Sequence, residues 1–182
     1  MGNNKNNGKT IEILEWVKSI LIAITVALII MFFIRPVVVH KQSMEPTFHS
    51  GDYIFISRQS YKMYGSPELG DVVVFRTGRF DEKGNEQYYI KRVIGVPGDS
   101  VEIIEGRVFV NDKVLDEEYL SDQFSSGNMN KVNIPEGKIF VMGDNRAHSL
   151  DSRSSEVGLV DISAVMGKVV FRGYPFNKIA LF

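Results

Sequence analysis

The sequence predicts a mostly β protein: an antiparallel β-sheet domain with a small inserted β excursion, tethered by one N-terminal transmembrane helix. Residues 19–34 form an apolar segment without a charged side chain. The chain after it consists of short runs rich in β-branched and aromatic residues, separated by Gly-Asp and Pro-Gly turn signals. No sustained amphipathic helical pattern is present outside the apolar segment. Together these observations favour a single β domain on a membrane stalk.

The apolar segment is predicted to be an uncleaved membrane anchor. As a helix, residues 19–34 would span about 24 Å, and flanking residues extend the anchor to 16–35. A cleaved signal peptide is disfavoured because no small-x-small site follows the apolar run. A buried core helix is disfavoured because no polar face recurs at helical spacing. Residues 1–15 are polar at their start and are expected to be disordered.

The remaining residues, 36–182, are expected to form the β-rich domain. A hairpin is predicted at residues 103–110 around Glu105 and Gly106, within a small insertion at about 101–137. The polar segment 77–87 is expected to be a long hairpin loop, and residues 161–166 a short helical turn. Strands are predicted at 53–57, 72–75, 89–96, 101–104, 107–110, 138–142 and 168–171.

Composition excludes several classes of function. The chain has 182 residues, with 21 basic and 22 acidic side chains and no long run of either sign, which argues against a nucleic-acid-binding surface. It contains no cysteine, so disulfides, thiolate zinc sites and cysteine nucleophiles are excluded. No His pair or acidic cluster has the spacing of a metal site, and no cofactor is expected.

Ser43 is a candidate nucleophile just beyond the anchor, in the run SMEPT at residues 43–47. A serine hydroxyl needs a base to accept its proton. The candidates are the three histidines, His40, His49 and His148, and Lys91 within an apolar run. A buried lysine would have a lowered pKa and could act as a neutral base. Periodicity does not decide whether Lys91 or Arg92 lies on the more buried face of its strand.

A third polar cluster, GDNRAHSLDSR, occupies residues 143–153 after a predicted strand. Seen alone, it is typical of a loop held by Asp–Arg pairs. A Ser/His/Asp hydrolase that uses His148 is an alternative, but adjacent residues of an extended segment point to opposite sides, which disfavours pairing of His148 with Ser149.

The three clusters occur in order on one anchored β domain, and this combination resembles the type I signal peptidases, the leader peptidases of bacteria. SMEPT at 43–47 resembles the family's nucleophile motif, and GDYI at 51–54 the strand after it. KRVIGVPGD at 91–99 matches the general-base motif, and residues 143–153 match the third. Three motifs in series are far more specific than any one of them. The single anchor and the short insertion resemble the Gram-positive form.

The resemblance implies a serine endopeptidase with a Ser/Lys dyad, in which neutral Lys91 takes the proton of Ser43. Ser149 would orient the Lys91 amine. Asp144, Asp151 and Arg153 would support the site. The Ser43 backbone N–H, Met44 and Gln42 would contact the substrate or its oxyanion. Some members carry a hydroxyl residue two positions before the nucleophile as an oxyanion donor, whereas this chain has Lys41 there.

The resemblance also implies the substrate and the location. Preproteins carrying signal peptides would be cleaved after small-x-small sites and would bind extended against a strand edge. The protein would cross the plasma membrane once, with residues 1–15 cytoplasmic and residues 36–182 extracytoplasmic, near the secretion translocon. A membrane-tethered β module that binds an envelope partner without catalysis is the alternative function.

Overall fold

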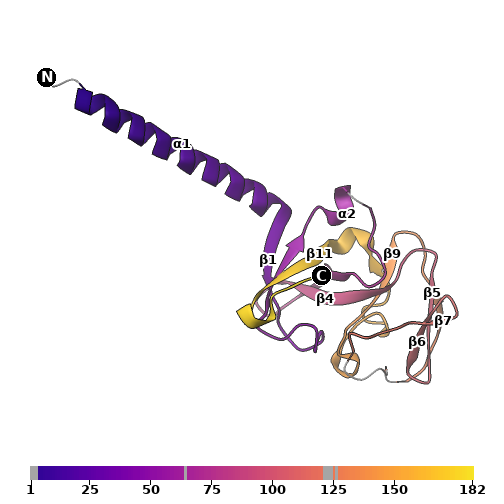
Figure 1. Ribbon diagram of the computed structural model, residues 1–182. Helices are drawn as coiled ribbons and strands as arrows, with labels where there is room; N and C mark the ends of the chain where they lie inside the picture. The colour runs from indigo at the N-terminus through magenta and orange to yellow at the C-terminus, as the bar shows by residue number, and fades with distance from the viewer. Residues whose placement is uncertain (1–3, 64, 121–124, 126) are drawn as a thin grey trace. The chain divides into compact units, whose positions relative to one another are not determined.

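The computed structural model describes residues 4–63, 65–120, 125 and 127–182. The chain divides into two compact units, Met1–Arg35 and Pro36–Phe182, which are described separately. The first unit contains helix α1, Asn4–Phe33 (Figure 1). Within α1, the stretch Glu12–Phe33 is long and apolar enough to cross a membrane. At 1.5 Å per residue it spans about 33 Å, which matches a hydrocarbon core.

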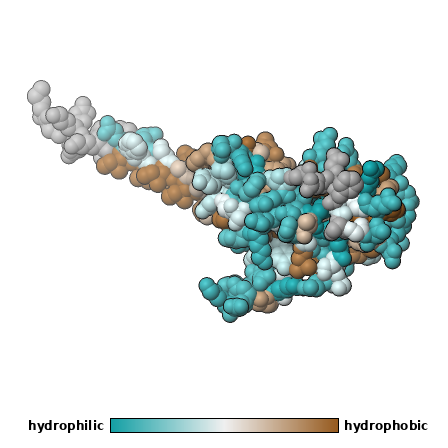
Figure 2. All heavy atoms as spheres, turned by 90° about the horizontal axis from the view of Figure 1, so that it is seen from below, coloured by the Kyte–Doolittle hydropathy of each residue, from teal (hydrophilic) through white to brown (hydrophobic). Residues whose placement is uncertain are grey.

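Helix α1 also includes residues 4–15, for which the sequence predicts disorder. Nucleation is the unfavourable step of helix formation. Because the apolar stretch is already helical, the neighbouring residues can extend the helix without a new nucleation step. Figure 2 shows hydrophobic residues along this helix. Side chains between Ile13 and Phe33 are largely exposed, which in water would be unfavourable and in a lipid bilayer is not.

The second unit contains two antiparallel sheets, as expected (Figure 1). The main sheet has eight strands in the order β1-β2-β11-β3-β4-β9-β10, with β12 paired to β11. Its strands are β1 (Ile34–Val38), β2 (Tyr53–Ser57), β3 (Val72–Phe80), β4 (Glu86–Gly95), β9 (Lys138–Met142), β10 (Val160–Asp161), β11 (Val165–Tyr174) and β12 (Ala180–Leu181).

The small sheet is the predicted insertion. Its strand order is β7-β6-β5-β8, and β5 and β6 form the expected hairpin, turning at Glu105 and Gly106. Both turn residues have positive φ, 48° and 77°, as tight hairpin turns of this kind require. The strands are β5 (Ser100–Ile104), β6 (Arg107–Val110), β7 (Lys113–Val114) and β8 (Met129–Asn133).

Short helical elements occur only in the connections of the described β unit. They are α2 (Ser60–Met63), η1 (Arg146–His148), η2 (Ile162–Ala164) and η3 (Phe176–Lys178), and η2 lies where the sequence predicts a helical turn. The expectation of a long loop at 77–87 is wrong. Strands β3 and β4 extend through this segment, and the turn is confined to 81–85. The cross-strand pairing of Phe80 with Glu86 outweighs the low strand propensity of the polar residues here.

Strand β3 is buried on both faces and separates two parts of the core. Val72 and Val74 pack on one face, and Val73 and Phe75 pack on the other. A third cluster, including Ile94, Val101 and Ile134, joins the small sheet to β4 and β9. The packing is tight here, and position 95 has no room for a side chain: a Cβ on Gly95 would lie 2.4 Å from Ile134 Cδ1.

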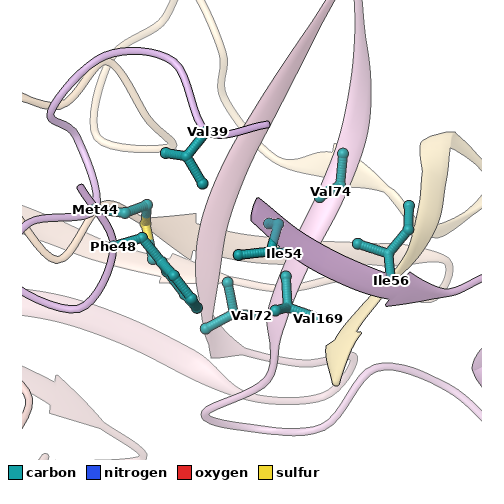
Figure 3. Packing of buried hydrophobic residues seen from close by; sticks show 8 residues of the cluster. All are labelled: Val39, Met44, Phe48, Ile54, Ile56, Val72, Val74 and Val169. Carbon is teal, nitrogen blue, oxygen red and sulfur yellow. The ribbon is translucent and has the colours of Figure 1, made fainter. Parts of the chain in front are cut away.

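The segment between β1 and β2 carries Ser43, and the core anchors it through apolar side chains. Val39, Met44 and Phe48 from this segment pack with Ile54 of β2 (Figure 3). Met44 and Phe48 have almost no exposed surface, at 1% and 0%. Because Met44 directly follows Ser43, its burial limits the positions that the Ser43 hydroxyl can take.

Truncating Phe48 tests this anchoring. We expect Phe48→Ala to lower the free energy of unfolding by about 3–5 kcal/mol, because it leaves a cavity beneath the segment that carries Ser43. Phe80→Ala, at an exposed position of β3, is the matched control and should change it by less than about 0.5 kcal/mol. Denaturant unfolding of both variants gives these values. Equal effects of the two substitutions would contradict the anchoring role of Phe48.

Candidate active site

The structure brings Ser43 and Lys91 together. Lys91 Nζ lies 2.7 Å from Ser43 Oγ and donates a second hydrogen bond, of 2.9 Å, to the Ile90 carbonyl. Lys91 belongs to β4, opposite Val73 of β3, so the centre of the main sheet positions the amine. Ser43 lies in the turn segment between β1 and β2. The contact therefore joins two segments that are distant in the sequence.

The sheet also resolves which cation of β4 is buried. Lys91 is only 3% exposed. Arg92, on the opposite face, donates two hydrogen bonds to Asp144, from Nε at 2.9 Å and from Nη2 at 2.7 Å. Arginine keeps its proton in such a pair, whereas lysine can lose its proton when desolvated. The residue that can act as a base thus faces the hydroxyl, and the permanent cation faces a carboxylate.

Burial lowers the pKa of the Lys91 amine to about 8, because a charged ammonium is poorly solvated there. The carboxylates of Asp151 and Asp144 oppose this shift, and the positive charges of Lys41 and Arg153 add to it. At such a pKa a substantial fraction of the amine is neutral near pH 8. A neutral amine 2.7 Å from a hydroxyl can accept its proton.

The loop 143–153 supports the segment that carries Ser43. The Asn145 N–H donates to the Ser43 carbonyl at 3.1 Å, and Asn145 Nδ2 donates to the Gln42 carbonyl at 3.1 Å. Gly143 lies so close that a Cβ there would be 2.4 Å from the Ser43 carbonyl and 2.3 Å from Ser149 Oγ. The loop therefore holds the backbone of Ser43 in place through hydrogen bonds and close packing. This packing leaves no room for a residue larger than glycine at position 143.

Asp144 and Asp151 organise this loop. Asp144 accepts the hydrogen bonds of Arg92 and one of 2.5 Å from Thr47 Oγ1, so it joins β4 to the segment that carries Ser43. Asp151 accepts from the Gly143 N–H at 2.9 Å and from Arg153 Nε at 2.8 Å. Burial by itself raises the pKa of the Asp151 carboxyl, but the Arg153 guanidinium and the Gly143 N–H hold that pKa below its usual value.

Ser149 lies beside Gly143 and Ser43, and its hydroxyl oxygen is buried without a hydrogen-bond partner in the described part of the chain. The hydrogen bonds of the Lys91 amine go to Ser43 and Ile90. A role of Ser149 in orienting Lys91 stays a prediction.

The residues expected to contact substrate occupy different environments. Gln42 is exposed, whereas the Met44 side chain is in the core and serves to anchor the segment. Lys41 is exposed and has a φ of 72°, an uncommon conformation for a residue with a side chain. Among the residues described, none accepts a hydrogen bond from the Ser43 N–H. That donor is free for an oxyanion.

The histidines do not form a catalytic arrangement with Ser43. His148 is exposed, and its Nδ1 lies 3.2 Å from Asn145 Oδ1. His40 is exposed as well, and His49 Nδ1 is buried without a hydrogen-bond partner in the described ranges. The geometry favours Lys91 over any histidine as the base. Among the residues described, no cluster of His, Asp and Glu is suited to bind a metal ion.

The sequence analysis missed Glu117 and Tyr119 and gave no partners for Thr47, Arg92 and Arg146. These contacts follow no periodicity or recognisable spacing, and only folding brings the residues together. Glu117 and Tyr119 lie in a polar segment of the insertion. The one available signal was a tyrosine and a leucine within otherwise polar residues, which is too weak to distinguish from an ordinary loop.

The buried amine of Lys91 has a testable cost in stability. Its pKa is about 10.5 in the unfolded chain and about 8 when folded, so the unfolded state binds more protons between these values and stability rises with pH there. At pH 7 the folded protein retains a poorly solvated ammonium. We therefore expect Lys91→Met to raise the melting temperature at pH 7, with the advantage shrinking between pH 8 and pH 10.5. Calorimetry across this range is the measurement, and a pH-independent difference would contradict the burial effect.

Comparison with known proteins gives a consistent result. A model of the signal peptidase family, peptidase S26, matches residues 13–174. The chain is 38% identical over 189 residues to a signal peptidase I of Bacillus licheniformis, with 98% of each protein covered. It is 37% identical over 185 residues to a signal peptidase IB of Staphylococcus aureus, with 92% of each covered.

Among solved structures, a signal peptidase I from Enterococcus faecalis is 30% identical and aligns with a TM-score of 0.47, covering 56% of this chain and 95% of that one. The family model spans most of the residues, from within the membrane helix to the end of β11, and the sequence relatives are covered over nearly their full length. The chain is thus a member of the type I signal peptidase family, peptidase S26.

Proposed function

We propose that this signal peptidase cleaves preproteins with a dyad of Ser43 and Lys91. The observation that carries the proposal is the distance of 2.7 Å between Lys91 Nζ and Ser43 Oγ, at an amine that is almost completely buried. The neutral amine removes the hydroxyl proton, Ser43 Oγ attacks the scissile carbonyl, and a tetrahedral intermediate forms. The protonated Lys91 donates its proton to the leaving amine as the C–N bond breaks, which leaves an acyl-enzyme. Neutral Lys91 then takes a proton from a water molecule, which attacks the ester, and Ser43 Oγ leaves as its hydroxyl while the new C-terminus is released.

The oxyanion of the tetrahedral intermediate would be stabilised by the Ser43 backbone N–H. This N–H is free of other hydrogen bonds in the described ranges. Asn145 Nδ2 donates to the Gln42 carbonyl, which belongs to the same peptide unit as the Ser43 N–H, and so helps to orient that donor. Lys41 supplies no hydroxyl, so the site relies more strongly on backbone donors. Ser149 would orient the Lys91 amine, while Asp144, Asp151 and Arg153 keep the loop in position through the hydrogen bonds described above.

The substrates would be signal-peptide-bearing preproteins cut after small-x-small sites. The proposed location is the plasma membrane, with residues 1–15 cytoplasmic, the anchor at 16–35 and the β domain at 36–182 outside, close to the translocon. A tether supports this, because Ser43 follows the end of α1 by only a short segment of chain, which limits its distance from a membrane that α1 would cross. Family membership favours this activity over a binding module without catalysis.

The dyad is tested by incubating a model preprotein with the full-length protein in detergent micelles and locating the cut by mass spectrometry. We expect Ser43→Ala and Lys91→Ala each to lower the cleavage rate by at least about 10³-fold, because nucleophile and base are lost. His148→Ala, in the same loop but exposed, is the matched control and should retain most activity. An active Lys91→Ala enzyme with an inactive His148→Ala enzyme would reverse the assignment.

The same measurement over a range of pH examines the base directly. Only neutral Lys91 can accept the proton, so kcat/KM should rise with pH and level off above a pKa of about 8. An acid limb centred near pH 6.5, the ordinary value of a histidine, would instead point to His148 or His49.

Gly143 provides a separate test of loop geometry. A methyl group there would meet the Ser43 carbonyl at 2.4 Å, and backbone cannot move aside as easily as a side chain. We expect Gly143→Ala to displace Ser43 and to lower kcat by about 100-fold, whereas Ala147→Ser, at an exposed position of the same loop, should leave kcat unchanged. Wild-type kcat in Gly143→Ala would show that the close packing around Ser43 is not required.

A further inference from the structure

The small sheet lies at one end of the β domain, and its role in the reaction is not evident from the sequence (Figure 1). Three polar side chains from the connection between β7 and β8 nevertheless reach the loop 143–153 or strand β4: Glu117, Tyr119 and Ser125. Glu117 is 6% exposed and Ser125 is 4% exposed. Charged side chains are seldom buried to this degree unless they are paired, so their partners indicate what the connection does.

The first partner is Arg146, which lies directly after Asn145 in the catalytic loop. Both ends of its guanidinium bond Glu117, with Arg146 Nη1 donating to Glu117 Oε2 at 2.9 Å and Nη2 donating to Oε1. Arg146 Nη1 also donates to Ser125 Oγ at 2.8 Å, and Nε donates to the Gly143 carbonyl at 3.1 Å. The paired guanidinium therefore connects the insertion to the residue that packs against Ser43.

The second partner is Arg92, the neighbour of Lys91 on β4. Its guanidinium lies over the ring of Tyr119, 3.9 Å from the ring centroid, and the Tyr119 hydroxyl donates to Glu117 Oε1 at 2.6 Å. Burial and the adjacent Glu117 carboxylate raise the pKa of Tyr119, so its hydroxyl keeps its proton and remains a donor. Arg92 in turn holds Asp144, and Asp144 holds Thr47.

These contacts form one continuous polar network. It begins at Glu117, passes through Arg146 to Gly143 on one side, and passes through Tyr119, Arg92 and Asp144 to Thr47 on the other. Both branches end at the segment that carries Ser43, since Gly143 packs against the Ser43 carbonyl and Thr47 belongs to the same turn. None of the insertion residues touches Ser43 or Lys91 in the contacts described.

We propose that Glu117 and Tyr119 are positioning residues, through which the small sheet keeps Ser43 within hydrogen-bond distance of Lys91. This inference rests on the proposed dyad. The two residues act through Arg146 and Arg92, so their loss should disturb catalysis without removing a group that contacts the substrate. A looser loop also admits water to Lys91, which weakens the desolvation that keeps its amine neutral. The groups that face this amine are Ser43, Asp144, Asp151, Lys41, Arg153 and the Tyr89 ring.

The experiment compares Glu117→Gln with Glu118→Gln in the full-length protein in detergent micelles. Glu118 is the exposed neighbour and the matched control. Gln keeps the shape of Glu117 but leaves the Arg146 cation without its counter-charge. We expect Glu117→Gln to lower kcat by about 10- to 100-fold with little change in KM, and to shift the acid limb of the kcat/KM profile to higher pH. Glu118→Gln should match the wild type in kcat and in pH profile.

A folding defect is separated from a positioning defect by two further measurements. Rates are expressed per folded molecule, with the folded fraction taken from the thermal unfolding curve of each variant. Tyr119→Leu, which leaves Glu117 in place but removes the ring beneath Arg92, should lower kcat by about 3- to 10-fold, and Tyr119→Phe should recover most of this loss. Wild-type kcat and pH profile per folded molecule in both Glu117→Gln and Tyr119→Leu would overturn the proposal.

Ser43→Ala, measured alongside, distinguishes the two levels of inference. If Ser43→Ala still cleaves the preprotein, the dyad itself is wrong, whatever the insertion variants do. If Ser43→Ala is inactive and the insertion variants behave as wild type, the dyad stands and only the positioning role of the small sheet fails.

Discussion

The desolvation of the Lys91 amine is the constraint on which the rest of the site depends. A lysine amine in water is almost fully protonated near neutral pH and cannot then accept a proton. The sheet lowers the pKa of the Lys91 amine by placing it opposite Val73 of β3, almost without solvent contact. Burial alone would be costly if the amine had no partner. The Ile90 carbonyl and the Ser43 hydroxyl give it polar contacts without supplying a counter-charge, so the neutral form remains accessible. Burial of the amine thus costs stability and gives it a pKa at which its neutral form can accept a proton.

The three arginines around the site are each paired with a carboxylate. Arg92 bonds Asp144, Arg153 bonds Asp151, and Arg146 bonds Glu117, each with a nearly buried carboxylate. Buried ion pairs add little net stability, because the cost of desolvation offsets their attraction, but they restrict geometry strongly. Here each pair has a member in the loop behind Ser43. The pairs therefore contribute more to the position of the loop than to stability. A small displacement of the loop would change the distance between Ser43 and Lys91.

The apolar helix α1 fits a membrane tether, and it ends a short way before Ser43 along the chain. The segment that carries Ser43 is held on two sides. Core packing of Met44 and Phe48 holds it on one side, and hydrogen bonds from the loop 143–153 hold it on the other. Ser43 is thus accurately placed although it belongs to a turn and not to a regular strand.

The sequence by itself determined the apolar N-terminal helix, the antiparallel class and the 105–106 hairpin, because local composition and period control these features. It predicted the wrong structure for 77–87, where cross-strand pairing outweighed local polarity. Only the tertiary structure decided that Lys91 and not Arg92 faces Ser43, since both alternate on one strand and the burial of each face depends on what packs against it. It alone joined Glu117 and Tyr119 to the catalytic loop, because such contacts depend on the packing of two sheets and leave no pattern along the chain.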